Sequence, residues 1–315
     1  MSDLRFINRG QVSELLAPEV LRPALEAALR ALALGEADVP PRIAAYATDG
    51  LLATMPGHLD GVGLAAKVVT VFPGNTPSHQ GVIVLADAST GTPLAIIDAE
   101  VITERRTAMT AAIAADRLAR DDAQVLTIVG AGAQGHAHMQ AFGPLRAWSE
   151  VRVVSCRRNS ATVLAAEARF GFGPEVTINE FDRFEEAVAG ADVLALCTHA
   201  ADPVIDPGWL SPGTHVSSVG SRAELPDALV RPGVVVDQLG AVTAPPPAGA
   251  IELQHIPVAD VVELGALLDD ASLGRQTEHQ VTVYKSTGHA VQDIAAARVV
   301  FDAAVAAGVG TMLAT

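Results

Sequence analysis

The feature that most constrains this chain is the glycine-rich turn Gly130-Ala131-Gly132-Ala133-Gln134-Gly135. It directly follows the apolar run 125–129 and opens a helical pattern over 136–145. A strand, such a turn and a helix together form the arrangement that binds a dinucleotide pyrophosphate at a helix N-terminus. A glycine turn that merely joins a strand to a helix is the alternative. We predict cofactor contacts from the turn residues Gly130, Gly132, Ala133, Gln134 and Gly135.

Further apolar runs alternate with helical patterns after this turn, which is typical of successive βαβ units. Because strands buried on both faces have continuous apolar sequences, these runs predict a parallel sheet with helices on both sides. The fold class is therefore α/β, with a Rossmann-type doubly wound sheet. The expected strands are 125–129, 151–155, 193–197, 215–219 and 234–237.

The N-terminal third has a different pattern, with a Leu- and Ala-rich helix at 18–34 followed by short strands with hairpin-type punctuation. It predicts a separate, mainly antiparallel domain, and a helix over about 101–120 that leads into the nucleotide-binding half. A strand at 281–284 and a helix at 289–307 lie beyond the sheet strands and could return to the first domain. The expected antiparallel strands are 51–55, 64–72, 82–87 and 94–98.

Composition excludes several classes of protein. The 315 residues include 21 Lys plus Arg against 36 Asp plus Glu, a net charge of −15 that disfavours nucleic acid as a partner. Two cysteines are too few for a disulfide scaffold or a Cys-rich metal site and fit a reducing compartment. The sequence has neither a signal-peptide pattern nor an apolar run of the ~20 residues that a membrane helix needs. We expect a cytoplasmic protein without membrane contact.

The end of the second predicted strand bears on cofactor choice. NAD-preferring sites place Asp or Glu there to bind the ribose 2′-hydroxyl, whereas this chain has Ser155, Arg157 and Arg158 at and after this position. A hydroxyl and two guanidinium groups suit a 2′-phosphate, so NADP(H) is favoured and NAD(H) stays possible. The alternative is that one or both arginines are solvated surface charges.

Cations in unusual settings mark a candidate substrate site outside the nucleotide-binding half. Lys67 interrupts an apolar strand pattern, so it is either buried and functional or a solvent-facing lysine on an edge strand. Arg106, in an Ala-rich helical region, and Arg42, after two prolines, could each bind a carboxylate with a guanidinium fork. Ser78 and His79 precede a strand and could line the same cleft, although His79 could equally be a turn residue. The histidines show no metal-ligand spacing, so we assign no metal.

Taken in order, these motifs resemble the ornithine cyclodeaminase and mu-crystallin family over nearly the whole chain. A chance match of one motif is easy, but a chance match of the ordered set is not. The motifs are Pro40-Pro41-Arg42, Lys67 with Phe72-Pro73-Gly74-Asn75, Ser78-His79-Gln80-Gly81, Thr90-Gly91-Thr92-Pro93-Leu94-Ala95, Ile102-Thr103-Glu104-Arg105-Arg106-Thr107-Ala108, the glycine turn, and the stretch from Tyr284 to Asp293.

The resemblance implies a homodimer in which a Rossmann domain, 119–284, accompanies a discontinuous dimerisation and substrate domain, 1–118 with 285–315. It implies that Arg42 and Arg106 bind the substrate carboxylate, that Lys67 lies beside the reacting imine or amine, and that Thr107 lies near the cofactor.

One departure from the family pattern concerns the reaction. Cyclodeaminases carry an aspartate after the fifth strand, and the matching segment 219–225 of this chain has none. We therefore expect an NAD(P)H-dependent reductase of a small α-imino acid, or an amino-acid dehydrogenase in reverse. Ornithine cyclodeaminase and a non-catalytic NADP(H)-binding protein of the crystallin type are the alternatives.

Overall fold

The computed structural model describes residues 4–75, 77–220 and 223–314. They form two compact units, Met1–Arg106 with Gly288–Thr315, and Thr107–Thr287. The first unit boundary falls inside the continuous helix α3 (Glu100–Leu118). The domain limits expected after residues 118 and 284 stay a prediction.

The first unit is built on one sheet with the strand order β16-β1-β7-β6-β5-β4-β2, and β3 also pairs with β4. Neighbours from β2 to β7 are antiparallel, as predicted, whereas β1 and β7 are parallel. Its elements are β1 (Leu4–Ile7), α1 (Arg9–Leu15), α2 (Pro18–Ala33), β2 (Ala37–Asp38), β3 (Ile43–Tyr46), β4 (Leu51–Leu59), β5 (Gly63–Val71), β6 (His79–Ala86), β7 (Pro93–Asp98), α9 (Ala290–Ala307) and β16 (Thr311–Leu313).

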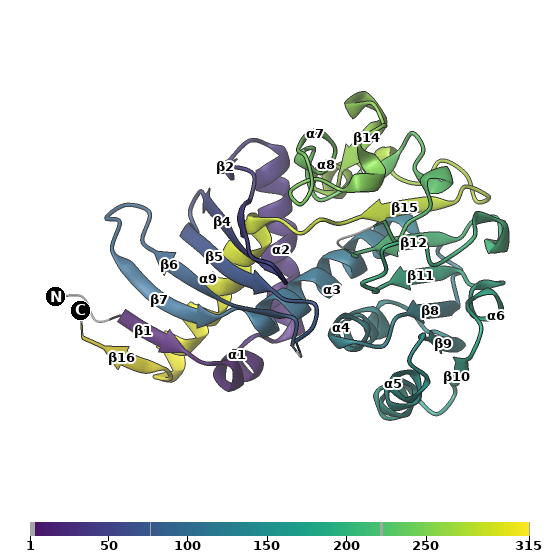
Figure 1. The fold of residues 1–315 in the computed structure, drawn as a ribbon, viewed down its shortest axis with the longest axis horizontal. Helices are drawn as coiled ribbons and strands as arrows, with labels where there is room; N and C mark the ends of the chain where they lie inside the picture. The colour runs from purple at the N-terminus through teal and green to yellow at the C-terminus, as the bar shows by residue number, and fades with distance from the viewer. Residues whose placement is uncertain (1–3, 76, 221–222, 315) are drawn as a thin grey trace. The chain divides into compact units, whose positions relative to one another are not determined.

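Helix α9 covers one face of this sheet, because it contacts β4, β5 and β6 as well as α1 and α2 (Figure 1). Side chains alternate between the two faces of a strand, so every second residue of β5 points toward the helix. The expected return of the helix at 289–307 to the first domain is confirmed. This return places C-terminal side chains against the central strands.

The second unit is a parallel sheet in the order β10-β9-β8-β11-β12-β15-β13-β14. Each pair of neighbouring strands among its described residues is parallel, which confirms the predicted α/β fold. The strand expected at 281–284 lies in this sheet, between β12 and β13, and does not join the first unit. The strands are β8 (Val125–Val129), β9 (Glu150–Val154), β10 (Thr177–Phe181), β11 (Val193–Leu196), β12 (His215–Ser218), β13 (Val234–Val236), β14 (Val261–Glu263) and β15 (Thr282–Lys285).

Helices and short turns connect these strands. The helices are α4 (Ala133–Phe142), α5 (Arg158–Gly171), α6 (Phe184–Val188), α7 (Gly240–Thr243) and α8 (Leu264–Asp269). Short 3-10 helices lie at Gly143–Leu145, Pro207–Trp209, Asp227–Leu229, Ile251–Leu253, Val258–Asp260 and Ala271–Leu273. No helix in the described part of the chain is long and apolar enough to cross a membrane.

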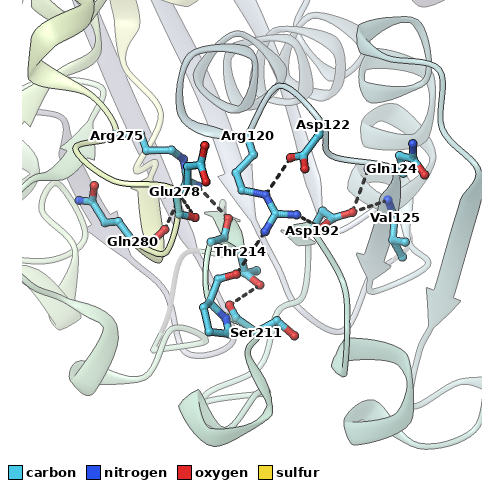
Figure 2. Close-up of polar contacts among 12 residues, drawn as sticks. Arg120, Asp122, Gln124, Val125, Asp192, Ser211, Thr214, Arg275, Glu278 and Gln280 are labelled. Carbon is cyan, nitrogen blue, oxygen red and sulfur yellow. Dashed lines mark hydrogen bonds and ion pairs between the residues drawn. The ribbon is translucent and has the colours of Figure 1, made fainter.

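A polar network closes the amino-terminal edge of the parallel sheet (Figure 2). The Asp192 carboxylate pairs with the Arg120 guanidinium at 2.7 Å and accepts hydrogen bonds from the backbone N–H groups of Gln124 and Val125. Arg275 donates to backbone carbonyls on several segments, including that of Leu118 at the end of α3. These contacts join the starts of β8 and β11.

Helix α5 offers a matched test of the packing of this unit. Leu164 is 1% exposed, whereas its neighbour Val163 is 52% exposed. We expect Leu164→Ala to lower the free energy of unfolding by about 2–5 kcal/mol, because it removes buried methyl groups and leaves a cavity. Val163→Ala should change it by less than about 0.5 kcal/mol. Urea unfolding followed by circular dichroism measures both, and equal losses would contradict the assigned faces of α5.

Candidate active site

Lys67 lies on β5, a strand with neighbours on both sides, so the edge-strand alternative is wrong. It pairs with Met55 of β4 and Ile83 of β6 and faces the side of the sheet that α9 covers. Its side chain is 3% exposed, and its Nζ lies 2.8 Å from the Asp293 Oδ2 atom of α9. The lysine is therefore buried and paired.

Arg106 joins the same cluster from α3. Its Nε lies 3.0 Å from Asp293 Oδ1, and its Nη1 donates to Gln292 Oε1 at 2.7 Å. The two oxygens of Asp293 thus hold a lysine on one side and an arginine on the other. Because the side chains of all three charged residues are at most 5% exposed, this arrangement is fixed by packing as well as by charge.

Gly288 and Arg42 complete the cluster. Gly288 has a φ of +69°, and a Cβ there would lie 2.7 Å from Nη1 of Arg106, so both backbone conformation and space require glycine. Its carbonyl oxygen accepts a hydrogen bond from Arg42 Nη2 at 2.6 Å. The structure therefore brings three of the predicted residues together: Arg42, Lys67 and Arg106.

Burial controls the ionisation of this cluster. Loss of hydration lowers the pKa of Lys67 from 10.5 to about 8; Asp293 opposes the shift, while Arg106 and Arg42 add to it. Burial also opposes ionisation of Asp293, but Arg106 and Lys67 outweigh it and lower the pKa of that carboxyl. Lys67 can therefore exchange a proton near neutral pH.

Ser78 and His79, the other two predicted substrate residues, lie farther along the sheet from Lys67. His79 pairs with Val71, four residues along β5 from Lys67, which corresponds to about 13 Å of strand, and Ser78 Oγ lies 3.0 Å from His79 Nδ1. The substrate role of Ser78 and His79 stays a prediction. Arg105, the neighbour of Arg106, binds the backbone carbonyls of Ser13 and Leu16 and is structural.

The glycine turn has the geometry that a pyrophosphate requires. Gly130 has a φ of +105°, and a Cβ there would lie 2.8 Å from the Cys197 carbonyl oxygen. A Cβ on Gly135 would lie 2.2 Å from the Gly130 carbonyl oxygen, so helix and strand pack closely here. A Cβ on Gly132 would meet nothing within 4 Å, and this residue begins α4 without a side-chain cap. The turn thus leaves open space at uncapped backbone N–H groups, which suits a phosphate.

The other predicted cofactor residues lie on the same unit. Ser155 follows β9, and its hydroxyl accepts a hydrogen bond from the Arg157 backbone N–H at 3.2 Å. Arg157 precedes α5 and is exposed, whereas Arg158 Nε lies 3.3 Å from Asp182 Oδ1. Thr107 is buried in α3.

The sequence profile of the ornithine cyclodeaminase/mu-crystallin family matches residues 5–308. The chain belongs to this family. It is 33% identical to the ketimine reductase mu-crystallin of Mus musculus over 316 residues, which cover 94% of the chain and 96% of that protein.

Solved structures agree with this membership. A Thermococcus litoralis Δ1-pyrroline-2-carboxylate reductase in complex with NADH and L-proline matches with a TM-score of 0.89 and 28% identity, over 98% of this chain and 100% of that one. An archaeal alanine dehydrogenase dimer with bound NAD matches with a TM-score of 0.89 and 28% identity, over 99% of each chain. The resemblance deduced from the motifs is confirmed.

Sequence reasoning left out two residues of the cluster. Gln292 and Asp293 lie in the C-terminal motif without a predicted role of their own, yet they bind Arg106 and Lys67. An acidic residue within an Ala- and Val-rich helix was the available signal, because a buried carboxylate needs a partner.

The ionisation of Lys67 can be measured directly, because the chain has only two lysines, Lys67 and Lys285. With ¹³Cε-labelled lysine, and Lys67→Met to assign the signals, we expect the Lys67 resonance to titrate near pH 8. Asp293→Asn should lower this midpoint, because it removes the group that favours the charged amine. A midpoint near 10.5, or one that Asp293→Asn leaves in place, would contradict the proposed pairing.

Proposed function

We propose that this protein is a nicotinamide-dependent oxidoreductase that reduces the C=N bond of a small α-imino acid, or oxidises the matching amino acid. The observation that carries the proposal is the charge of the buried cluster, in which Lys67 and Arg106 share the single carboxylate of Asp293. Arg42 adds another cation nearby. Cations gathered in this way would attract a substrate carboxylate even in a protein whose net charge is −15.

Different residues of the chain would bind the substrate and transfer the proton. Arg42 and Arg106 would anchor the substrate carboxylate, and Lys67 would donate a proton to the product nitrogen or accept one in reverse. When bound, the cofactor supplies the hydride at nicotinamide C4. The named activities of the relatives, on ketimines, pyrroline-2-carboxylate and alanine, involve bonds of this class.

Ornithine cyclodeamination is less well supported. Segment 219–225 contains no aspartate, and its one carboxylate, Glu224, is fully buried. The Glu224 oxygens accept hydrogen bonds from Thr198, Ser218 and Gly220, which leaves them committed to the protein backbone and hydroxyls. Ser221 and Arg222 of this segment lie outside the described residues.

For the cofactor we propose a preference for NADP(H) over NAD(H). Arg157 is exposed beside the first turn of α5, where its guanidinium and the positive end of the helix would both attract a 2′-phosphate. Arg158 contributes less, since Asp182 is already its partner.

We also propose a homodimer, as in the alanine dehydrogenase structure. The face of the first unit's sheet opposite Lys67 carries large exposed apolar side chains on adjacent strands, including Leu52 of β4, Leu64 of β5 and Val84 of β6. A second copy would remove these apolar side chains from water.

Lys67→Ala tests the reaction. We expect at least a 100-fold loss of turnover, within the range for a lost general acid or base, with little change in NADPH binding. In the wild type, imine reduction should fall as pH rises through about 8, because Lys67 loses its proton, and amino-acid oxidation should rise over the same interval. The assay is cofactor oxidation with pyrroline- and piperideine-2-carboxylate and with 2-oxo acids plus ammonia or methylamine.

Several outcomes would count against the proposal. Unchanged turnover of Lys67→Ala would remove the lysine from the reaction. Proline and ammonia from ornithine would favour the cyclodeaminase, and tight NADPH binding without turnover on any of these substrates would favour a binding protein.

Arg157→Ala tests cofactor choice. We expect NADPH affinity to fall about tenfold, in line with loss of a charge-assisted contact of about 1.4 kcal/mol, while NADH affinity changes little. Arg158→Ala is the control and should have the smaller effect. Fluorescence titration measures the dissociation constants of both cofactors for the wild type and the two variants. An equal loss of affinity for both cofactors in Arg157→Ala would contradict a 2′-phosphate site at Arg157.

A further inference from the structure

A second cluster of buried charges lies at the carboxyl edge of the parallel sheet, after β12 and β15. Lys285, the last residue of β15, is 1% exposed and lies 2.9 Å from Glu252 Oε1. The Lys285 Nζ also donates to the Gly220 carbonyl oxygen at 2.7 Å and to Ser218 Oγ at 3.1 Å. Both lysines of the chain are thus buried beside a carboxylate.

Glu224 holds the same segment from the other side. Its Oε1 accepts hydrogen bonds from the Gly220 N–H at 2.6 Å and the Ser218 hydroxyl at 2.9 Å. Its Oε2 accepts from the Thr198 N–H at 2.9 Å and the Thr198 hydroxyl at 2.7 Å. The Gly220 residue therefore has its N–H bound by Glu224 and its carbonyl bound by Lys285.

Glycine at position 220 leaves room for the Glu224 carboxylate. A Cβ on Gly220 would lie 2.5 Å from the Glu224 carboxyl carbon, so the carboxylate occupies the space of a side chain. Glu224 is itself held by Thr198, which follows β11, and by Ser218 of β12, so its carboxylate contacts two neighbouring strands. The end of β12 is therefore held in place before any ligand arrives.

The cluster carries a net negative charge. Lys285 is matched by Glu252, whereas the four hydrogen-bond donors to Glu224 are neutral backbone and hydroxyl groups. The cluster therefore has one more carboxylate than cation, in a buried setting where screening by water is weak. Asp237, buried after β13, is a further carboxylate at this edge and accepts hydrogen bonds from Tyr284 and Ser286, the neighbours of Lys285 in the chain.

The strand order indicates which half of a bound dinucleotide this edge would contact. In a doubly wound sheet the dinucleotide crosses the carboxyl ends of the strands at the switch point, here between β8 and β11. The glycine turn follows β8, and the predicted 2′-phosphate residues follow β9, so the adenosine half belongs to that side. The ends of β11 and β12 lie on the other side of β8 from β9 (Figure 1). The nicotinamide half of a bound dinucleotide would therefore lie over them.

We propose that Glu224, with Gly220 held between it and Lys285, positions the end of β12 and favours the oxidised, positively charged nicotinamide over the neutral, reduced one. A buried negative charge stabilises a cation nearby and does little for a neutral ring. Glu224 is a positioning residue that would also ease hydride release. The proposal depends on the proposed function only in that a nicotinamide cofactor binds.

The test is the ratio of the dissociation constants of NADP⁺ and NADPH, measured by calorimetry on the full-length protein at fixed pH and salt. We expect Glu224→Gln to weaken NADP⁺ binding about tenfold relative to NADPH, the order expected for one charge in a partly screened site. Glu252→Gln also removes one negative charge but leaves the Glu224 contacts intact, so it should shift the ratio in the same direction. It serves as the second variant if Glu224→Gln does not fold.

Asp192→Asn is the matched control, because Asp192 is likewise an acceptor of two backbone N–H groups but lies at the amino edge (Figure 2). It should lower the melting temperature without moving the ratio. Equal weakening of both cofactor forms by Glu224→Gln and Glu252→Gln would overturn the electrostatic role. Failure of the wild type to bind either form would instead contradict the proposed function.

Discussion

The buried cluster depends on the two ion pairs that the Asp293 carboxylate forms with Lys67 and Arg106. The carboxylate lies between Lys67 and Arg106, and without it two cations would face each other in a region from which water is excluded. A buried charge is costly unless it is paired, so removing one member of such a set leaves the others uncompensated. The Asp293 carboxylate therefore stabilises the burial of both cations.

The carboxylates at the two edges of the parallel sheet have different partners. At the amino edge, Asp192 is matched by Arg120, and the network serves to join strand starts. At the carboxyl edge, Glu224 is satisfied by neutral donors, and its charge is not cancelled. Hydrogen bonds stabilise both carboxylates. Of the two, only Glu224, whose hydrogen-bond donors are all neutral, would exert an electrostatic field on a bound cofactor.

Local requirements explain which parts could be predicted from the sequence. The glycine turn was predictable because positive φ at Gly130 and close packing at Gly135 exclude other residues, whatever the rest of the chain does. The parallel strands were predictable where they are buried on both faces. β10 was missed because its residues are partly exposed and give no continuous apolar run.

The sequence by itself determined the α/β class, the dinucleotide turn and the family, because each follows from residues close together or from an ordered set of motifs. Only the tertiary structure decided that Lys67 is buried, that Asp293 is its partner, and that Ser78 and His79 lie along the strand from it. The reason is distance along the chain: 226 positions separate Lys67 from Asp293, and their contact exists only because α9 packs against β5. Spacing in sequence carries no information about such a contact until the sheet and the helix are in place.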